Sequence, residues 1–130
     1  MPSQKVKDNG SGELTVIGAA SVSVEADSAH TIPAANLVGG FGTIVPTSAR
    51  ALTFDTAANI DAAQPWAKIG DVLVYSIVNN SGGANAVTFS TNTGLTFKNS
   101  TASVAQNKMG QAYFVKTGSA TYDVYTIAGA

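Results

Sequence analysis

The chain of 130 residues contains no cysteine, which excludes disulfides, zinc–thiolate sites and cysteine nucleophiles. Its longest apolar run is far shorter than the roughly 18 residues that would cross a bilayer, so no membrane is expected as a partner. The N-terminal sequence MPSQKVKDNG lacks the hydrophobic stretch of a secretory signal, and we therefore do not expect Sec-type export.

Charge is also scarce, because only 12% of the residues are charged and the net charge is −1. An ordinary soluble domain has about 25% charged residues. The seven basic residues are scattered, which argues against nucleic acid as a partner. A surface with few ions loses little solvation energy when it packs against a neighbour, so the composition favours contacts with other proteins.

Catalytic groups are few. The single histidine, His30, follows Asp27 and Ser28 closely in the sequence, but a relay needs an oriented base and a nucleophile within its reach. One histidine cannot make a multi-histidine metal site. Asp55 and Asp61 flank the start of a short helix, where acids complement the helix dipole. We expect no enzymatic activity, cofactor or metal. A calcium site built from Asp and Asn oxygens in loops stays an alternative, although no EF-hand-like spacing supports it.

The residues that are abundant predict strands. Thirteen Val and seven Ile outnumber five Leu, and there are 14 Thr, which is typical of pleated sheets. Strand patterns recur every 8 to 12 residues, as in sandwiches and barrels. We predict an all-β fold, an antiparallel, jelly-roll-like β-sandwich, with strands near residues 14–17, 21–25, 30–32, 43–45, 50–54, 72–78, 86–90, 95–97, 101–104, 112–116 and 122–127.

One short helix is predicted around residues 57–64. The Thr56 hydroxyl can cap its first turn, and Pro65 disfavours helical geometry at Gln64. The strand at 72–78 is apolar on both faces and should be central; a turn at 79–83 predicts a hairpin with 86–90. Residues 1–12 are expected to form a polar N-terminal arm, and residues 13–130 a single domain.

The last two strands carry apolar residues on both faces. Tyr125 and Ile127 share one face of their strand, while Tyr122 and Val124 share the other. A small sandwich buries only one face of each sheet, so the second face requires another buried contact. Self-association provides such a contact; cover from a loop or from the helix is the alternative.

The region from 49 to 130 resembles a known family. It contains RALTFDTAANI at 50–60, IGD at 69–71, YSIVNN at 75–80, VTF at 87–89, NTGLTF at 92–97 and TYDVYTI at 121–127. This order is similar to a β-sandwich module of tailed-bacteriophage structural proteins, which include capsid decoration proteins and head-fibre domains. The resemblance implies a homotrimer on the virion surface without enzymatic activity.

We therefore expect a capsid decoration (cement) protein that is assembled in the host cytoplasm and binds the major capsid protein on the outer surface of the virion. The residues expected to contact the capsid or a sister subunit are Val6, Leu14, Trp66, Phe114 and Tyr122. The alternative is a receptor-binding or fibre-tip module for host glycans, in which aromatic residues stack on sugar rings. Its candidate aromatic residues are Phe41, Trp66, Tyr113 and Tyr122. A non-viral adhesin or surface-layer domain is a further alternative.

Overall fold

The computed structural model describes residues 5–8, 14–17, 22–99 and 103–129, the first two segments as backbone alone. The described chain is mostly β, with two short helices. The strands are Lys5–Asp8 (β1), Leu14–Ile17 (β2), Ser23–Val24 (β3), His30–Ile32 (β4), Phe41–Ile44 (β5), Arg50–Phe54 (β6), Val72–Asn79 (β7), Val87–Ser90 (β8), Leu95–Phe97 (β9), Ser103–Val104 (β10), Met109–Gly118 (β11) and Thr121–Ala128 (β12); the helices are Ala34–Gly39 (α1) and Ala57–Ala63 (α2).

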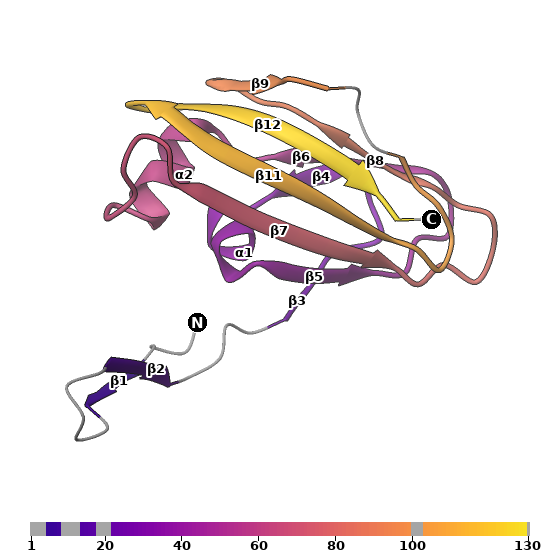
Figure 1. Ribbon diagram of the computed structural model, residues 1–130. Helices are drawn as coiled ribbons and strands as arrows, with labels where there is room; N and C mark the ends of the chain where they lie inside the picture. Colours follow the sequence, from indigo (N-terminus) through magenta and orange to yellow (C-terminus); the bar gives the residue numbers. More distant parts are fainter. Residues whose placement is uncertain (1–4, 9–13, 18–21, 100–102, 130) are drawn as a thin grey trace.

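The strands form two main sheets and one small one (Figure 1). The larger sheet has six strands in the order β3-β5-β7-β11-β12-β9, and the smaller main sheet has four in the order β10-β8-β6-β4. β1 and β2 pair antiparallel with each other, so the segment expected to be an arm includes a strand that the sequence analysis did not predict. Residues 1–4 and 9–12 of that segment lie outside the described residues.

Both main sheets are mixed, which corrects the prediction of antiparallel pairing throughout. The chain alternates between the two sheets from β4 to β11, one strand at a time. Up to β8, two successive crossings restore the original strand direction, so β4, β6 and β8 pair parallel, as do β3, β5 and β7. β10 then pairs antiparallel with β8, and β11 pairs antiparallel with β7. The predicted hairpin between 72–78 and 86–90 is wrong for the same reason, because β7 and β8 belong to different sheets. The last two strands, β11 and β12, pair antiparallel as a hairpin.

The predicted helix is confirmed as α2. The Thr56 Oγ1 accepts a hydrogen bond from the Asn59 backbone N–H at 3.2 Å, and the helix ends at Ala63, with Gln64 as its C-cap before Pro65. The expectation of only one helix is wrong, since α1 follows Pro33 and ends at Gly39, with Gly40 as its C-cap at a φ of +87°. Proline at the start and glycine after the end are boundary signals that fit a helix of six residues.

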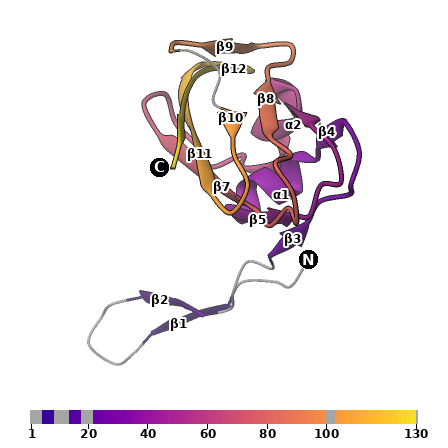
Figure 2. The same ribbon diagram turned by 90° about the vertical axis from the view of Figure 1, so that its right-hand side faces the viewer.

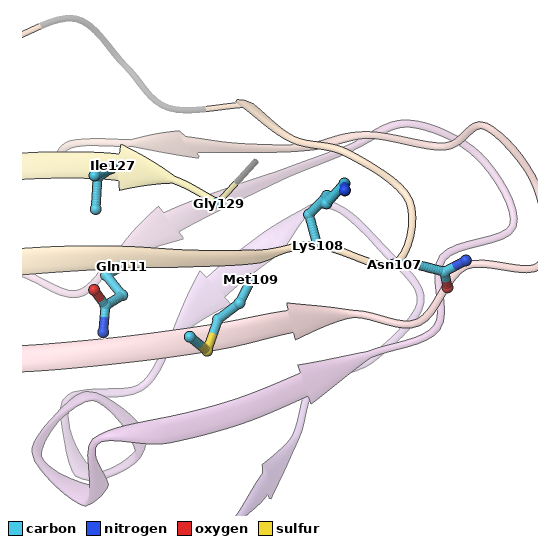
Figure 3. A pocket seen from close by; sticks show the side chains of 6 residues that line it. All are labelled: Asn107, Lys108, Met109, Gln111, Ile127 and Gly129. Carbon is cyan, nitrogen blue, oxygen red and sulfur yellow. The ribbon is translucent and has the colours of Figure 1, made fainter.

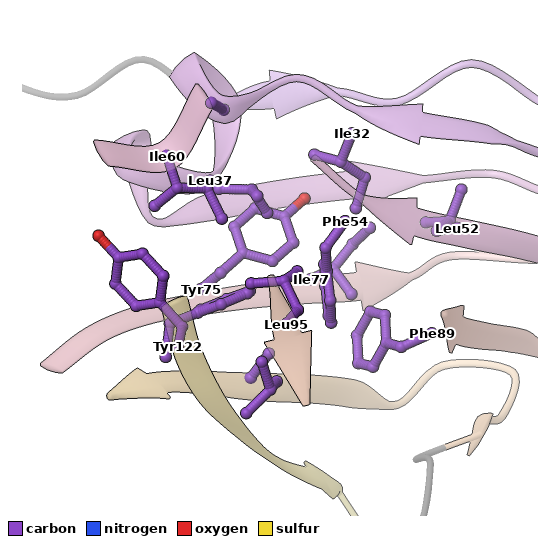
Figure 4. Packing of buried hydrophobic residues seen from close by; sticks show 14 of the residues in the cluster. Ile32, Leu37, Leu52, Phe54, Ile60, Tyr75, Ile77, Phe89, Leu95 and Tyr122 are labelled. Atoms are coloured by element: carbon purple, nitrogen blue, oxygen red, sulfur yellow. The ribbon is translucent and has the colours of Figure 1, made fainter. Parts of the chain in front are cut away.

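One hydrophobic core lies between the two main sheets (Figures 2 and 4). Phe54 of the four-stranded sheet is fully buried, with its ring centroid 5.0 Å from that of Phe89 and 4.9 Å from that of Phe114 in the six-stranded sheet. Leu37 of α1 and Ile60 of α2 join the same cluster with no exposed surface. Both helices therefore pack on the inner side of the large sheet.

Gly94 lies where a side chain does not fit. Its φ is +83°, and an added Cβ would be 2.5 Å from the Ala120 carbonyl oxygen and 2.6 Å from the Ala57 Cβ. We expect Gly94→Ala to lower the free energy of unfolding by about 2–4 kcal/mol, through backbone strain and overpacking. Chemical denaturation measures this change. Gly82→Ala is the matched control, because nothing lies within 4 Å of its added Cβ; equal effects in both variants would contradict the explanation.

Candidate functional site

The most distinctive surface is the side of the six-stranded sheet that points away from the core. In β7, Tyr75 and Ile77 are buried, whereas Val72 and Val74 are 53% and 37% exposed. The same alternation continues across the sheet. We call the following set the outer face: Phe41, Thr43, Val72, Val74, Ser76, Val78, Met109, Gln111, Tyr113, Val115, Asp123, Tyr125 and Ile127.

The strand register places these side chains in rows that cross the sheet. Val74 pairs with Tyr113, which pairs with Tyr125 on the next strand. In the next row, two residues away along each strand, Gln111 lies between Ser76 and Ile127. Neighbours at this spacing contact one another, so the apolar groups form a continuous patch rather than isolated positions.

The polar side chains in the middle of the outer face bond to each other. The Gln111 Nε2 donates to the Ser76 Oγ at 3.1 Å, and the Tyr113 hydroxyl donates to the Gln111 Oε1 at 3.0 Å. Burying polar groups that already have partners costs much less free energy than burying unpaired ones. Covering this part of the sheet therefore carries a small desolvation penalty.

A cavity of about 340 Å³ lies at one end of the outer face (Figure 3). Its lining includes Met109, Gln111 and Ile127 of the face, together with Asn107 and Lys108 of the preceding turn. Lys108 brings a cation to the rim of this cavity. The cavity therefore lies between the apolar residues of the outer face and the polar residues Asn107 and Lys108.

Neither helix covers the outer face, because Leu37 and Ile60 pack into the core on the opposite side of the sheet. Among the described residues, Tyr125 is still 42% exposed and Ile127 is 57% exposed. The alternative explanation of the two apolar faces, cover from the helix, is therefore wrong for these two residues.

The expected contact residues fall into three groups. Phe114 and Tyr122 have 0% and 1% exposure, so they are core residues, which corrects the expectation that they contact a partner. Trp66 is 68% exposed. Val6 lies in β1, opposite Val16, and Leu14 lies in β2; their side chains are outside the described part.

Trp66 belongs to a well-bonded loop that joins α2 to β7. The Lys68 backbone N–H donates to the Asp71 Oδ2 at 2.9 Å, and the Gly70 N–H donates to the Lys116 carbonyl at 2.8 Å. Ile69, on the same loop, is 71% exposed. The loop thus presents two large apolar side chains from a fixed backbone.

The environment of His30 argues against catalysis. Its Nε2 lies 2.9 Å from the Glu25 Oε1, and its Nδ1 lies 2.8 Å from the Ser28 carbonyl oxygen. Both partners are acceptors, so in the protonated ring both nitrogens donate, and neither is then able to take a proton from the Ser28 hydroxyl, 3.4 Å from Nδ1. Asp27, the carboxylate expected nearby, instead accepts from Thr47 and Arg50.

The pair of His30 and buried Glu25 predicts a pH-dependent stability. Burial lowers the pKa of His30, but the hydrogen bonds to Glu25 and to the Ser28 carbonyl outweigh it and raise the pKa above 6.5. The stabilisation is complete below about pH 6.5, the value for unfolded histidine, and is lost as pH rises through the higher folded pKa. We expect the difference in melting temperature between the wild-type protein and His30→Gln to shrink from pH 6 to pH 9. A constant difference would contradict this role.

Other carboxylates have structural partners. Asp55 accepts from the backbone N–H groups of Ala34 and Thr56, which ties the start of α1 to the segment before α2. Over residues 22–99 and 103–129, no three His, Cys, Asp or Glu side chains gather in a way that could hold a metal ion. No helix in the described part is both long enough and apolar enough to cross a membrane.

Comparisons with known proteins add no relative. No family model, curated protein or solved structure matches the chain. The outer face and the Trp66 loop are therefore the surface features that bear on function. Sequence alternation indicated the face through Tyr125 and Ile127, but it missed Phe41 and Met109, whose neighbours on the outer face come from distant strands.

Proposed function

We propose that the chain is a virion structural protein of a tailed bacteriophage, a capsid decoration protein that binds the outer capsid surface as a homotrimer. In this proposal the two mixed sheets form a β-sandwich, and the major capsid protein is the second partner. The order of motifs from 49 to 130 supports the family, and the scarcity of charge supports a protein that works through contacts with other proteins.

The observation that carries the proposal is the uncovered outer face. Monomeric soluble proteins rarely expose large continuous apolar patches, and such patches mark sites of association. Here the patch crosses several strands of the six-stranded sheet, between Phe41 and Ile127. A protein that functions in an assembly has a reason to keep this surface.

The proposed mechanism adds buried area across the junctions between capsid subunits. Each trimer sits where several subunits meet, and its N-terminal segment and exposed loops contact the shell. Trp66 and Ile69 are our candidates for that contact, since large exposed side chains on a fixed loop bury area with little loss of loop entropy. Shared contacts of this kind oppose the separation of neighbouring capsid subunits.

The test compares capsids with and without the protein. We expect decorated capsids to withstand higher temperature and more chelator before they release their genome, and Trp66→Ala to weaken binding to the shell. Thr88→Ala, at an exposed position on β8 of the four-stranded sheet, is the control for binding. Equal heat stability of bare and decorated capsids would overturn the cementing role.

The exposure of Trp66 also favours the alternative, a receptor-binding or fibre-tip module. An indole 68% exposed on a fixed loop can stack on a sugar ring. The two functions differ in copy number, since decoration requires hundreds of copies per particle and a fibre tip only a few. Cryo-electron microscopy of the virion counts them.

A further inference from the structure

We propose that the outer face is the homotypic interface, buried against the outer faces of sister copies, whereas the capsid contacts another surface. This inference deepens the proposed function and depends on the homotrimer that it includes. The occupant is a second copy of this chain, and three observations on the face support it.

The first observation is its size. Four strands of the face, β5, β7, β11 and β12, spaced about 4.8 Å apart, give a width of about 19 Å, and the length of β7 is about 26 Å. Because β5 has only four residues, the area is about 440 Å² for one copy. In a trimer each face is shared between two neighbours, so three faces together bury about 1,300 Å², comparable in total with one specific interface. The strand lengths that enter this estimate are eight residues for both β7 and β12.

The second observation is the nearly complete lack of charge. Asp123 is the sole ionisable carboxylate on the outer face as defined, and the register places it in the row of Val72 and Val115, away from the centre. Apart from Asp123, and Lys108 at the rim of the neighbouring cavity, the outer face offers no charge for a charged partner to recognise. Its complement is another apolar surface, and a sister copy supplies one.

The third observation is the bonded polar group at the centre. Ser76, Gln111 and Tyr113 form hydrogen bonds with one another within one face, so covering these three side chains requires few polar bonds between copies. A solvated sheet face normally alternates apolar-in with polar-out. The centre of this face is therefore suited to contact with another apolar surface. Three such faces can close around a three-fold axis through heterologous contacts.

The decisive variant places lysine in the central row, as Val74→Lys combined with Tyr125→Lys. Both side chains are partly exposed in the protomer, at 37% and 42%, so lysine can reach solvent when the copies are apart. We expect the dissociation constant of the oligomer to rise more than about 100-fold, because the charges lose solvent on association. The molecular mass in analytical ultracentrifugation falls to that of one chain, 13.1 kDa.

Trp66→Lys is the matched control, because it adds a charge on the loop instead of the face and should leave the mass unchanged. A cysteine-labelling experiment checks the same surface without disrupting it, since the natural chain contains no cysteine. A single cysteine at Val74 should react with a polar maleimide more slowly than one at Trp66. Its labelling should become faster when Tyr125→Lys separates the copies, whereas labelling of the Trp66 cysteine should not change, and no change at Val74 would contradict the interface.

The outcomes separate this inference from the proposed function. A wild-type trimer that the double lysine variant leaves intact, with Val74 cysteine labelled freely, would overturn the interface and leave the homotrimer standing. A trimeric variant that no longer binds capsids would assign the face to the capsid protein and also overturn the inference. A wild-type monomer would overturn the homotrimer itself.

Discussion

Phe54→Ala is expected to lower the free energy of unfolding by about 3–5 kcal/mol, the usual range for truncating a buried aromatic side chain. Phe54 has no exposed surface, and its ring lies against Phe89 in its own sheet and Phe114 in the other. Its removal leaves a cavity where the two sheets meet. For a chain of this length the melting temperature should fall by more than about 10 °C.

Thermal unfolding followed by circular dichroism measures this effect. Phe41→Ala is the matched control, since Phe41 is 37% exposed on the outer face and does not belong to the core cluster. Under conditions that keep the copies apart, we expect its effect to be much smaller. Similar shifts in the two variants would show that the core is not centred on Phe54.

Asp61→Ala is expected to lower the free energy of unfolding by about 2–4 kcal/mol, since it leaves several partly buried donors without an acceptor. Asp61 in α2 accepts from the Lys116 Nζ at 2.8 Å, the Ala120 N–H at 2.7 Å and the Tyr122 hydroxyl at 2.5 Å. It therefore connects the helix to the β11–β12 hairpin. A double-mutant cycle with Lys116→Ala isolates the share of the ion pair.

The pH dependence of stability in acid provides a second test of the Asp61 contacts. Burial raises the pKa of its carboxyl, but the hydrogen bonds from Lys116, Tyr122 and Ala120 outweigh burial and hold the pKa below 3.8. The stabilisation is present above the unfolded pKa, near 3.8, and is lost as pH falls through the lower folded value. The stability gap between wild type and Asp61→Ala should therefore narrow in acid. A gap that stays constant down to pH 2 would contradict the ionised contact.

The positions of the strands could be predicted from the sequence, but their assignment to sheets could not. Period-two alternation and turn residues locate β7, β11 and β12 within a few residues. Which sheet a strand joins depends on contacts between distant segments, such as β6 with β8, and no local pattern records these. The helix α1 was missed because Ala34 and Leu37 are too few to establish a helical period; packing of Leu37 and the bond from Ala34 to Asp55 hold it.

The same limit explains the error at the candidate site. Alternation separates Tyr122 and Val124 from Tyr125 and Ile127, yet both pairs are equally apolar, so the sequence does not say which pair faces inward. The structure decides, because the Tyr122 hydroxyl meets Asp61 and Gln64 inside the protomer. The inference of a second apolar face was sound, while the choice of Phe114 and Tyr122 as contacts was not.

The measurement that tests the account most directly is the native mass of the purified wild-type protein by mass spectrometry at micromolar concentration. One chain has a mass of 13.1 kDa, and the account predicts a single species of three chains, about 39 kDa. A stable species of 13.1 kDa at the same concentration would show that the outer face tolerates water, and the assembly role would be wrong.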